Sequence, residues 1–211
     1  MDIVCLLFEG ITALDIVGPY EVLQRLPEAN VKFVAKAAGE VRTDNKFLAL
    51  VADYALAEVT SAHVLVIPGG FATRALEGDT ALLEWIRAVD ATTTWTTSVC
   101  TGSLLLAAAG LLDGKEATTH WASLDRLKEY GAIPTGRRVV EQGKIITAAG
   151  VSSGIDMGLT LVARIAGDEY AQGVQLGIEY DPQPPFDSGS LEKAPAPVAD
   201  FMRELYGVRG L

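Results

Sequence analysis

A cysteine at residue 100 stands where strand-like sequence changes to helix-like sequence. Residues 92–99 are rich in β-branched side chains, which favour a strand, and an apolar stretch typical of a helix begins at Gly102. A sharp strand-to-helix turn places the Cys100 side chain at the carboxyl edge of a parallel sheet, where open α/β folds bind ligands. The start of the helix would stabilise a thiolate, the reactive form of cysteine. Cys100 is therefore a candidate nucleophile, although a small buried residue explains the position equally well.

The sequence Pro68-Gly69-Gly70 ends a second buried strand, expected over residues 64–67. Glycines at such a point let backbone N–H groups approach a ligand closely, as an oxyanion hole requires. A tight turn without function explains the pair of glycines almost as well. The functional interpretation depends on Gly70 lying beside Cys100, and the sequence spacing does not decide that.

Asp15 follows the first strand-like run, at the same expected edge of the sheet. A carboxyl group that faces an apolar pocket and a cysteine has a raised pKa and can carry a proton. On the residues alone, a helix N-cap or an exposed acid is the favoured alternative for Asp15. Glu21 is a competing acid, but its neighbours are typical of a solvated helix face.

The remaining candidates are weaker. His120 is the other possible general base, although a lone histidine is more often structural. His63 precedes the strand at residues 64–67 and is expected at the opposite, amino-terminal side of the sheet. Cys5 lies within an apolar run and is interpreted as a buried core residue.

The elements that position these residues alternate between strands and helices. Strands are expected at residues 3–8, 31–37, 64–67, 92–99 and 144–148, and helices at 13–26, from Asp79, at 102–109 and at 155–166. Such alternation predicts an α/β fold with a mainly parallel sheet and helices on both faces, in one domain over residues 1–211. Short strands at 41–43 and 48–52 form an expected edge hairpin. The proline-rich residues 181–197 are expected to form an arm against the domain or a partner subunit, followed by a helix at 198–206.

Composition excludes several classes of protein. Of the 211 residues, 49% are hydrophobic and 21% are charged, as in a globular protein and unlike a disordered chain. The net charge of −10 disfavours binding to nucleic acid. The longest apolar run, 104–112, is far shorter than the roughly 20 residues that a bilayer requires. With no basic residue before Arg25, and only two cysteines and two histidines, we expect a reduced cytoplasmic protein without a metal or cofactor.

Several segments together resemble the ThiJ/PfpI superfamily over nearly the whole chain, and within it the isonitrile (isocyanide) hydratase subgroup. These segments are LLFEGITALDIVGPYEVL, VLVIPGGF, TSVCTGSLLLAAAGLLDGKEATTHW, AAGVSSGIDMGLTLVARIAG and QLGIEYDPQPPFDSGS. The resemblance implies a flavodoxin-like sandwich that forms a homodimer with its site near the interface. It also implies that Cys100 is the nucleophile, Asp15 the acid, Thr101 a positioning residue and Gly70 N–H the oxyanion donor.

The residue after the nucleophile departs from the pattern of the protease-like members. Those members place a histidine there, and this chain has Thr101, so peptide hydrolysis is not expected. The resemblance instead implies hydration of a small isocyanide to an N-substituted formamide through a Cys100 thioimidate, with Asp15 exchanging protons.

The alternative is a cysteine-based redox domain, or a ligand-sensing domain like those of AraC-type regulators. No DNA-binding portion is expected, because the chain is acidic and stops soon after its last helix.

Overall fold

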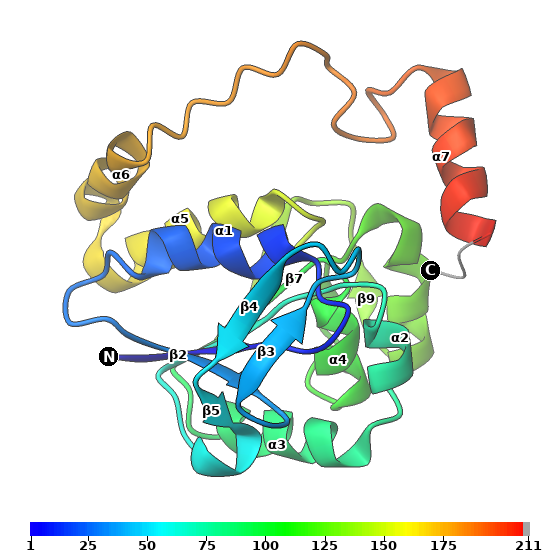
Figure 1. The fold of residues 1–211 in the computed structure, drawn as a ribbon. Coiled ribbons are helices and arrows are strands. Elements are labelled where there is room, and N and C mark those ends of the chain that lie inside the picture. The colour runs from blue at the N-terminus through cyan, green and yellow to red at the C-terminus, as the bar shows by residue number, and fades with distance from the viewer. Residues whose placement is uncertain (209–211) are drawn as a thin grey trace.

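The computed structural model describes residues 1–208, and its main sheet has seven strands in the order β10-β11-β7-β6-β1-β2-β5 (Figure 1). All neighbouring strands are parallel except β10, which runs antiparallel to β11. The order of the inner strands, 2-1-3-4-5 when β1, β2, β6, β7 and β11 are numbered along the chain, is that of flavodoxin. The bounds are β1 Asp2–Leu6, β2 Asn30–Ala35, β5 Tyr54–Ala55, β6 Val64–Ile67, β7 Trp95–Val99, β10 Val139–Gln142 and β11 Ile145–Ala148.

The innermost strands are apolar because helices cover both of their faces. Every residue of β6 is buried, and β1 is buried from Ile3 to its end. Both strands therefore form continuous apolar runs instead of alternating with polar residues, as the sequence predicts for a parallel sheet. Cys5 pairs with Phe33 on one side and Val66 on the other, which places it in the middle of the core.

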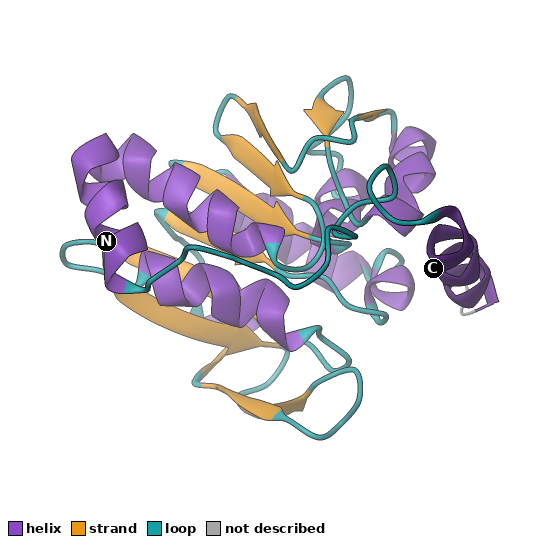
Figure 2. Cartoon of the chain, turned by 90° about the horizontal axis from the view of Figure 1, so that it is seen from above, coloured by secondary structure: helices purple, strands orange, loops and turns teal. Residues whose placement is uncertain are grey.

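The helices form two layers, one on each side of the sheet (Figures 1 and 2). Helix α1 packs on α5, which also contacts β11 and α6, whereas α4 contacts β6, β7 and α3. The predicted N-cap at Asp79 is present, because its carboxylate accepts a hydrogen bond from Leu82 N–H at 3.2 Å. The bounds are α1 Ala13–Leu23, α2 Thr73–Leu76, α3 Thr80–Asp90, α4 Gly102–Ala108, α5 Ser153–Ala166 and α6 Asp168–Gly177.

Smaller elements connect these layers. The expected hairpin forms a separate two-stranded sheet of β3 (Gly39–Arg42) and β4 (Ala49–Ala52). A second small sheet pairs β8 with β9, and two 3₁₀ helices complete the described elements. Their bounds are β8 Glu116–Ala117, β9 Ile133–Pro134, η1 Leu56–Glu58 and η2 Trp121–Tyr130. Among residues 1–208, no helix has the length and apolar character needed to cross a membrane.

Most predicted bounds agree with the structure to within two residues, and two elements differ by three residues at one end for local reasons. The strand expected at 92–99 begins at Trp95, because Thr92 and Thr93 N–H donate to carbonyls of α3 and form a turn. The helix expected at 13–26 ends at Leu23, where three further residues continue as hydrogen-bonded turns.

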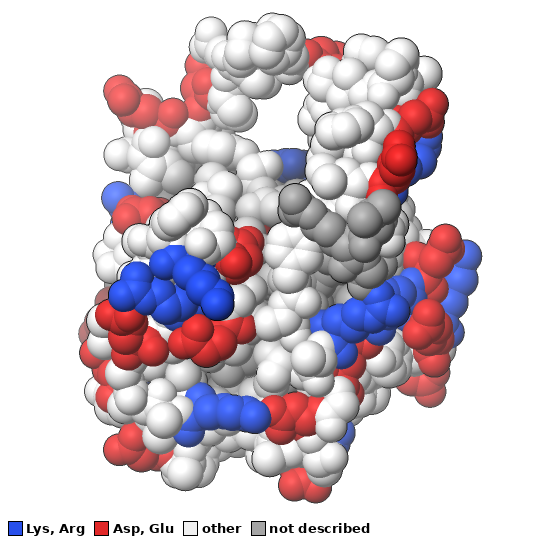
Figure 3. All heavy atoms as spheres, turned by 45° about the vertical axis from the view of Figure 1, so that its right-hand side comes forward, with Lys and Arg blue, Asp and Glu red and all other residues white. Residues whose placement is uncertain are grey.

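The segment after α6 leaves the body of the fold as the expected arm. It arches over α1 and α5 and leads to α7 (Ala196–Val208) on the far side of the molecule (Figure 1). A space-filling view shows an opening between this arm and the body, and acidic and basic side chains are interspersed on the face in view (Figure 3). Phe186 in the arm is 77% exposed. We use "arm" below for residues 181–195.

Candidate active site

Cys100 occupies a strained turn between β7 and α4. Its backbone φ is 55°, in the left-handed region that L-residues other than glycine rarely adopt. The turn is held by hydrogen bonds, because Cys100 N–H donates to the carbonyls of Ala148 and Ala149 at 3.0 and 3.1 Å. Thr119 Oγ1 donates to the Cys100 carbonyl at 2.9 Å. The surrounding strands therefore fix the sharp strand-to-helix turn at Cys100 that the sequence predicts.

Two glycines allow this turn to approach the end of β6. A Cβ on Gly102 would lie 2.2 Å from the carbonyl oxygen of Ile67, so only glycine fits there. A Cβ on Gly69 would lie 2.6 Å from Thr101 N and 2.8 Å from Asp15 Oδ2. Gly69, just after β6, and Gly102, just after Cys100, thus allow the carboxyl ends of β6 and β7 to lie close together.

Asp15 lies in the first turn of α1 and is completely buried. Its Oδ2 accepts a hydrogen bond from Gly69 N–H at 3.0 Å, and Oδ1 makes no normal hydrogen bond with any described residue. Burial raises the pKa of Asp15 to about 7. Hydrogen bonds from Gly69 N–H and the Cys100 thiol lower the pKa, but by less than burial raises it. Neither alternative from the sequence holds, because Asp15 is neither exposed nor the helix N-cap, which is Thr12.

The thiol of Cys100 interacts with the Asp15 carboxyl, and this contact affects its ionisation. The side chain is 6% exposed, and burial, followed by the negative charge of Asp15, raises the pKa of Cys100 well above its ordinary range. The N–H of Thr101 favours the thiolate, but its effect is smaller than the two opposing effects. Burial and the Asp15 charge therefore oppose the thiolate that the start of the helix would stabilise.

Thr101 and Gly70 form a reciprocal pair beside the cysteine. Gly70 N–H donates to Thr101 Oγ1 at 3.0 Å, and the same hydroxyl lies 3.2 Å from the Gly70 carbonyl. Both residues line the cavity at Cys100, as the sequence predicts. The N–H expected to form an oxyanion hole is thus already bonded to a side chain, so it is not a free donor.

The cavity in front of the thiol is small, with a volume of about 130 Å³. It is lined by Thr12, Asp44, Gly70, Phe71, Cys100, Thr101, His120, Val151 and Tyr206. These residues come from regions far apart in the sequence. Most walls are apolar or uncharged, so the site suits a small molecule with little charge.

His120 forms one wall of this cavity. Its Nδ1 accepts a hydrogen bond from Ala122 N–H at 3.3 Å, and burial lowers the pKa of the ring to about 4. A neutral ring whose Nδ1 is an acceptor carries its proton on Nε2. His120 is therefore a hydrogen-bond donor toward other groups, and it does not have the pKa of a general base at neutral pH.

Asp44 is a second acid at the cavity that sequence reasoning missed. It follows β3, accepts a hydrogen bond from Thr12 Oγ1 at 3.1 Å, and contributes to raising the pKa of Asp15. The local sequence does not indicate a functional role for Asp44, because its position at the cavity depends on how the β3–β4 hairpin packs against the rest of the fold. Tyr206 was also missed, because it reaches the cavity from α7 at the end of the arm.

The other candidates lie away from the cavity. Cys5 is 1% exposed, and burial raises its pKa to about 12. Glu21 pairs with Arg25 on the surface of α1. His63 accepts a hydrogen bond from Asp2 N–H at the amino end of the sheet, as expected from the sequence.

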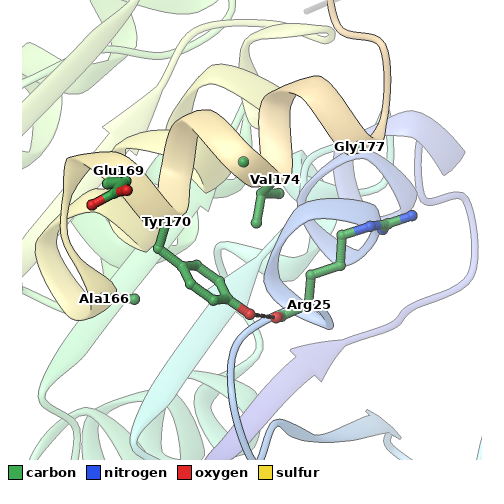
Figure 4. A pocket seen from close by; sticks show the side chains of 7 residues that line it. Arg25, Ala166, Glu169, Tyr170, Val174 and Gly177 are labelled. Atoms are coloured by element: carbon green, nitrogen blue, oxygen red, sulfur yellow. Dashed lines mark hydrogen bonds between the residues drawn. The ribbon is translucent and has the colours of Figure 1, made fainter.

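A larger hollow of about 790 Å³ lies between the end of α1 and α6 (Figure 4). Arg25, Glu169 and Tyr170 are among its lining residues, and Tyr170 donates a hydrogen bond to the Arg25 carbonyl. It contains no cysteine. The candidate residues Cys100, Thr101 and Gly70 line the smaller cavity instead.

The arrangement around Cys100 matches a known family. The model of the DJ-1/PfpI family matches residues 1–164. The chain belongs to the DJ-1/PfpI family. This result confirms the resemblance to the ThiJ/PfpI superfamily that the sequence segments indicate, and the match contains Asp15, Gly70, Cys100 and Thr101.

Similar proteins agree with membership of the DJ-1/PfpI family. The chain is 45% identical to isonitrile hydratase of Pseudomonas putida, over 94% of this chain and 87% of that protein. A ThiJ/PfpI family protein from Pseudomonas syringae superposes with a TM-score of 0.94 at 42% identity, over 98% of this chain and 86% of that one. The transcriptional regulator CdhR of Pseudomonas aeruginosa is 35% identical, over 62% of this chain and 38% of its own length. These matches confirm the flavodoxin-like α/β fold.

Proposed function

We propose that this protein is an isonitrile hydratase that converts an isocyanide and water into an N-substituted formamide. The observation that carries the proposal is the buried Asp15 carboxyl against the Cys100 thiol, at the elbow of a chain 45% identical to an isonitrile hydratase. An isocyanide, R–N≡C, accepts both a nucleophile and a proton at its terminal carbon. A thiol beside a carboxyl with a pKa near 7 can supply both.

In the first half of the reaction, the Cys100 sulfur forms a bond to the isocyanide carbon. The thiol proton passes to the Asp15 carboxylate, which then delivers it to the same carbon. The C≡N triple bond becomes a double bond, and the product is the thioimidate R–N=CH–S–Cys100. The thiol thus becomes ionised only as it attacks, which agrees with its raised pKa in the free protein.

In the second half, water adds to the thioimidate carbon. Asp15, again a carboxylate, accepts one proton from the water and passes it to the nitrogen as the C=N bond becomes single, and the other water proton stays on the new hydroxyl until Asp15 transfers it to the leaving sulfur. Breaking the C–S bond then releases R–NH–CHO, and the sulfur recovers its proton. One carboxyl group serves as base and acid in turn, so the steps use only substrate, water and these side chains.

Thr101 and Gly70 are proposed to position the intermediate. Because Gly70 N–H is bonded to Thr101 Oγ1, an oxyanion at this position would have to share that N–H with the hydroxyl. We therefore assign Thr101 the task of holding Gly70 in place, and Gly70 N–H a role only once the intermediate has formed.

We also propose that the protein acts in the cytoplasm as a homodimer, in which residues 1–211 form one domain. The support comes from the segment after α5, where the arm leaves an opening over the body of the fold (Figure 3) and apolar side chains are exposed. Phe186 in the arm is 77% exposed, and Leu176 in the preceding helix α6 is 78% exposed. Exposed apolar surface of this kind is typical of contact with another protein chain.

The direct test is incubation of the purified protein with a simple alkyl isocyanide, with the formamide measured by mass spectrometry. Cys100→Ala should abolish formamide production, and Cys5→Ser serves as the matched control that should retain it. Turnover by Cys100→Ala would disprove covalent catalysis. Absence of turnover by the wild-type protein toward a series of alkyl and aryl isocyanides would refute the proposed function.

The alternative, a cysteine-based redox or ligand sensor, is less well supported by the geometry. Oxidation of cysteine depends on thiolate character and exposure, and Cys100 has little of either. Peroxide titration followed by mass spectrometry distinguishes the two functions. A sensor would oxidise at Cys100 at peroxide concentrations that leave free glutathione reduced.

A further inference from the structure

The cavity at Cys100 is closed on one side by a residue from the last described helix. Tyr206 of α7 lines the cavity together with Cys100, although the two residues are separated by most of the C-terminal half of the chain. The remaining walls come from the body of the fold. Tyr206 is therefore a wall that the arm delivers from outside the sheet.

Tyr206 is held by two aromatic rings at the start of η2. Its ring centroid lies 5.0 Å from that of His120 and 5.2 Å from that of Trp121, and the contact with Trp121 is edge to face. The His120 and Trp121 rings are 5.3 Å apart, so the three rings form one cluster. These separations lie within the range in which aromatic pairs attract one another.

The rest of α7 depends on the same cluster for its position. Beyond Tyr206, Trp121 shares a small cavity with Val198, Ala199 and Met202 of α7, and Ala199 is buried. Phe201 lines neither of these two cavities and is 62% exposed. The helix is thus placed by a limited apolar contact instead of by the core.

The size of the cavity restricts what can occupy it. The cavity has a volume of about 130 Å³ and is open to solvent, so the residues that line it control access to Cys100. The ring of Tyr206 in the wall leaves less room for a cyclohexyl or aryl substituent than for a methyl or ethyl one. Substitution of Tyr206 by a small residue would merge the cavity with solvent on the α7 side.

We propose that Tyr206, held against His120 and Trp121, sets the upper size limit of the molecules that reach Cys100. The identity of those molecules as isocyanides rests on the proposed function, but the size limit itself does not. Tyr206 is a specificity-determining residue and takes no part in bond formation. The aromatic ring of Tyr206 sets the size limit, so removal of the hydroxyl should leave the limit unchanged.

The test measures modification of Cys100 by methyl and benzyl methanethiosulfonate, which attach a small or a bulky thiol group by the same reaction. Peptide mass spectrometry reports modification at Cys100 separately from the buried Cys5. In the wild-type protein, the methyl-to-benzyl rate ratio should exceed that of free glutathione by about tenfold or more. In Tyr206→Ala the ratio should fall to within about twofold of the glutathione value.

Three further variants complete the test. Tyr206→Phe and Phe201→Ala should keep the wild-type ratio, and Tyr206→Leu, which preserves more bulk, should give an intermediate ratio. A wild-type ratio equal to that of glutathione, or a ratio unchanged in both Tyr206→Ala and Tyr206→Leu, would overturn the proposal. A change in Phe201→Ala equal to that in Tyr206→Ala would also overturn it, because the effect would then belong to α7 in general.

The same variants separate this proposal from the proposed function. If the hydratase function and the size limit both hold, Tyr206→Ala should raise kcat/KM for cyclohexyl isocyanide relative to methyl isocyanide by about tenfold or more. If no isocyanide is hydrated but the methanethiosulfonate ratio shifts as expected, the hydratase assignment fails and the size limit stands. Hydration by all variants with an unchanged size preference refutes the size limit alone.

Discussion

Asp15 and Cys100 are both buried, and each changes the ionisation of the other. Burial raises the pKa of both groups; beyond that, the Asp15 charge raises the pKa of the thiol, and the thiol stabilises the Asp15 carboxylate. Both shifts favour retention of a proton by the pair, and we propose that this proton passes between the sulfur and the carboxyl during turnover. The predictions below follow from that shared proton and from the groups that hold the pair.

The pH dependence of turnover should follow Asp15. Below pH 7 both groups are protonated, so the carboxyl cannot accept the thiol proton. As the pH rises through about 7, Asp15 becomes a carboxylate while Cys100 keeps its proton, which is the reactive state. We expect kcat/KM to rise about tenfold per pH unit below 7 and to level off above it. A profile that falls as the pH rises through 7 would contradict this assignment.

Asp15→Asn should separate thiol reactivity from turnover. The amide cannot exchange a proton with the thiol, so we expect formamide production to fall by about 10²–10⁴-fold. Removing the negative charge lowers the pKa of Cys100, so the thiol should react faster with iodoacetamide at pH 9. Unchanged turnover would show that Asp15 is not the proton carrier.

The same substitution should stabilise the fold at high pH. A carboxyl whose pKa is about 7 when folded and about 3.9 when unfolded binds more protons in the folded state between these values. Stability therefore falls as the pH rises from about 4 to 7, by at most about 4 kcal/mol. In urea unfolding, Asp15→Asn should have a higher free energy of unfolding than the wild type at pH 8 and a similar one at pH 4. A wild-type protein equally stable at both pH values would contradict the buried ionisation.

Thr101→Val should cost both stability and activity. The substitution removes the hydroxyl that accepts from Gly70 N–H and leaves that buried N–H without a partner, at about 1–3 kcal/mol. Thr101→Ser keeps the hydroxyl and should recover most of the loss. Thermal unfolding of the two variants and the wild type measures this difference. Equal melting temperatures for Val and Ser at this position would show that the hydrogen bond contributes little.

His120→Asn should leave the pH profile unchanged. The asparagine side chain can accept the Ala122 N–H hydrogen bond that His120 Nδ1 accepts now. Because the ring is neutral above about pH 4, its removal should not move the midpoint near pH 7. A shift of the midpoint by more than about one pH unit would indicate that His120 takes part in proton transfer.

The sequence was sufficient for the parts of the fold that follow from local patterns. Continuous apolar runs correctly predicted β1 and β6, and the change from β-branched to helical residues located the turn at Cys100. The two glycines at 69 and 70 indicated a close approach, and the structure shows one at both, to Thr101 and Asp15 at Gly69 and to the Gly10 carbonyl at Gly70. Family membership then agreed with the segments that carry these same residues.

What the sequence could not supply was the effect of distant packing. The direction of the pKa shift of Cys100 depends on burial and on the Asp15 charge. The start of the seven-residue helix α4 therefore did not predict it. Asp44 and Tyr206 reach the cavity through the β3–β4 hairpin and the arm, whose positions are set by contacts between remote segments. The hydrogen bond from Gly70 N–H to Thr101 was missed as well, because the two residues lie far apart in the chain.

Tyr206, one wall of the cavity, is joined covalently to the body of the fold only through the arm. A protease that cut within residues 181–195 would separate α7 from the body without breaking any strand of the sheet. Asp15 and Cys100 would remain together after such a cut, with Tyr206 attached only by its contacts with His120 and Trp121. Scission there would relax the choice of substrate while the secondary structure and the proton-sharing pair stayed intact.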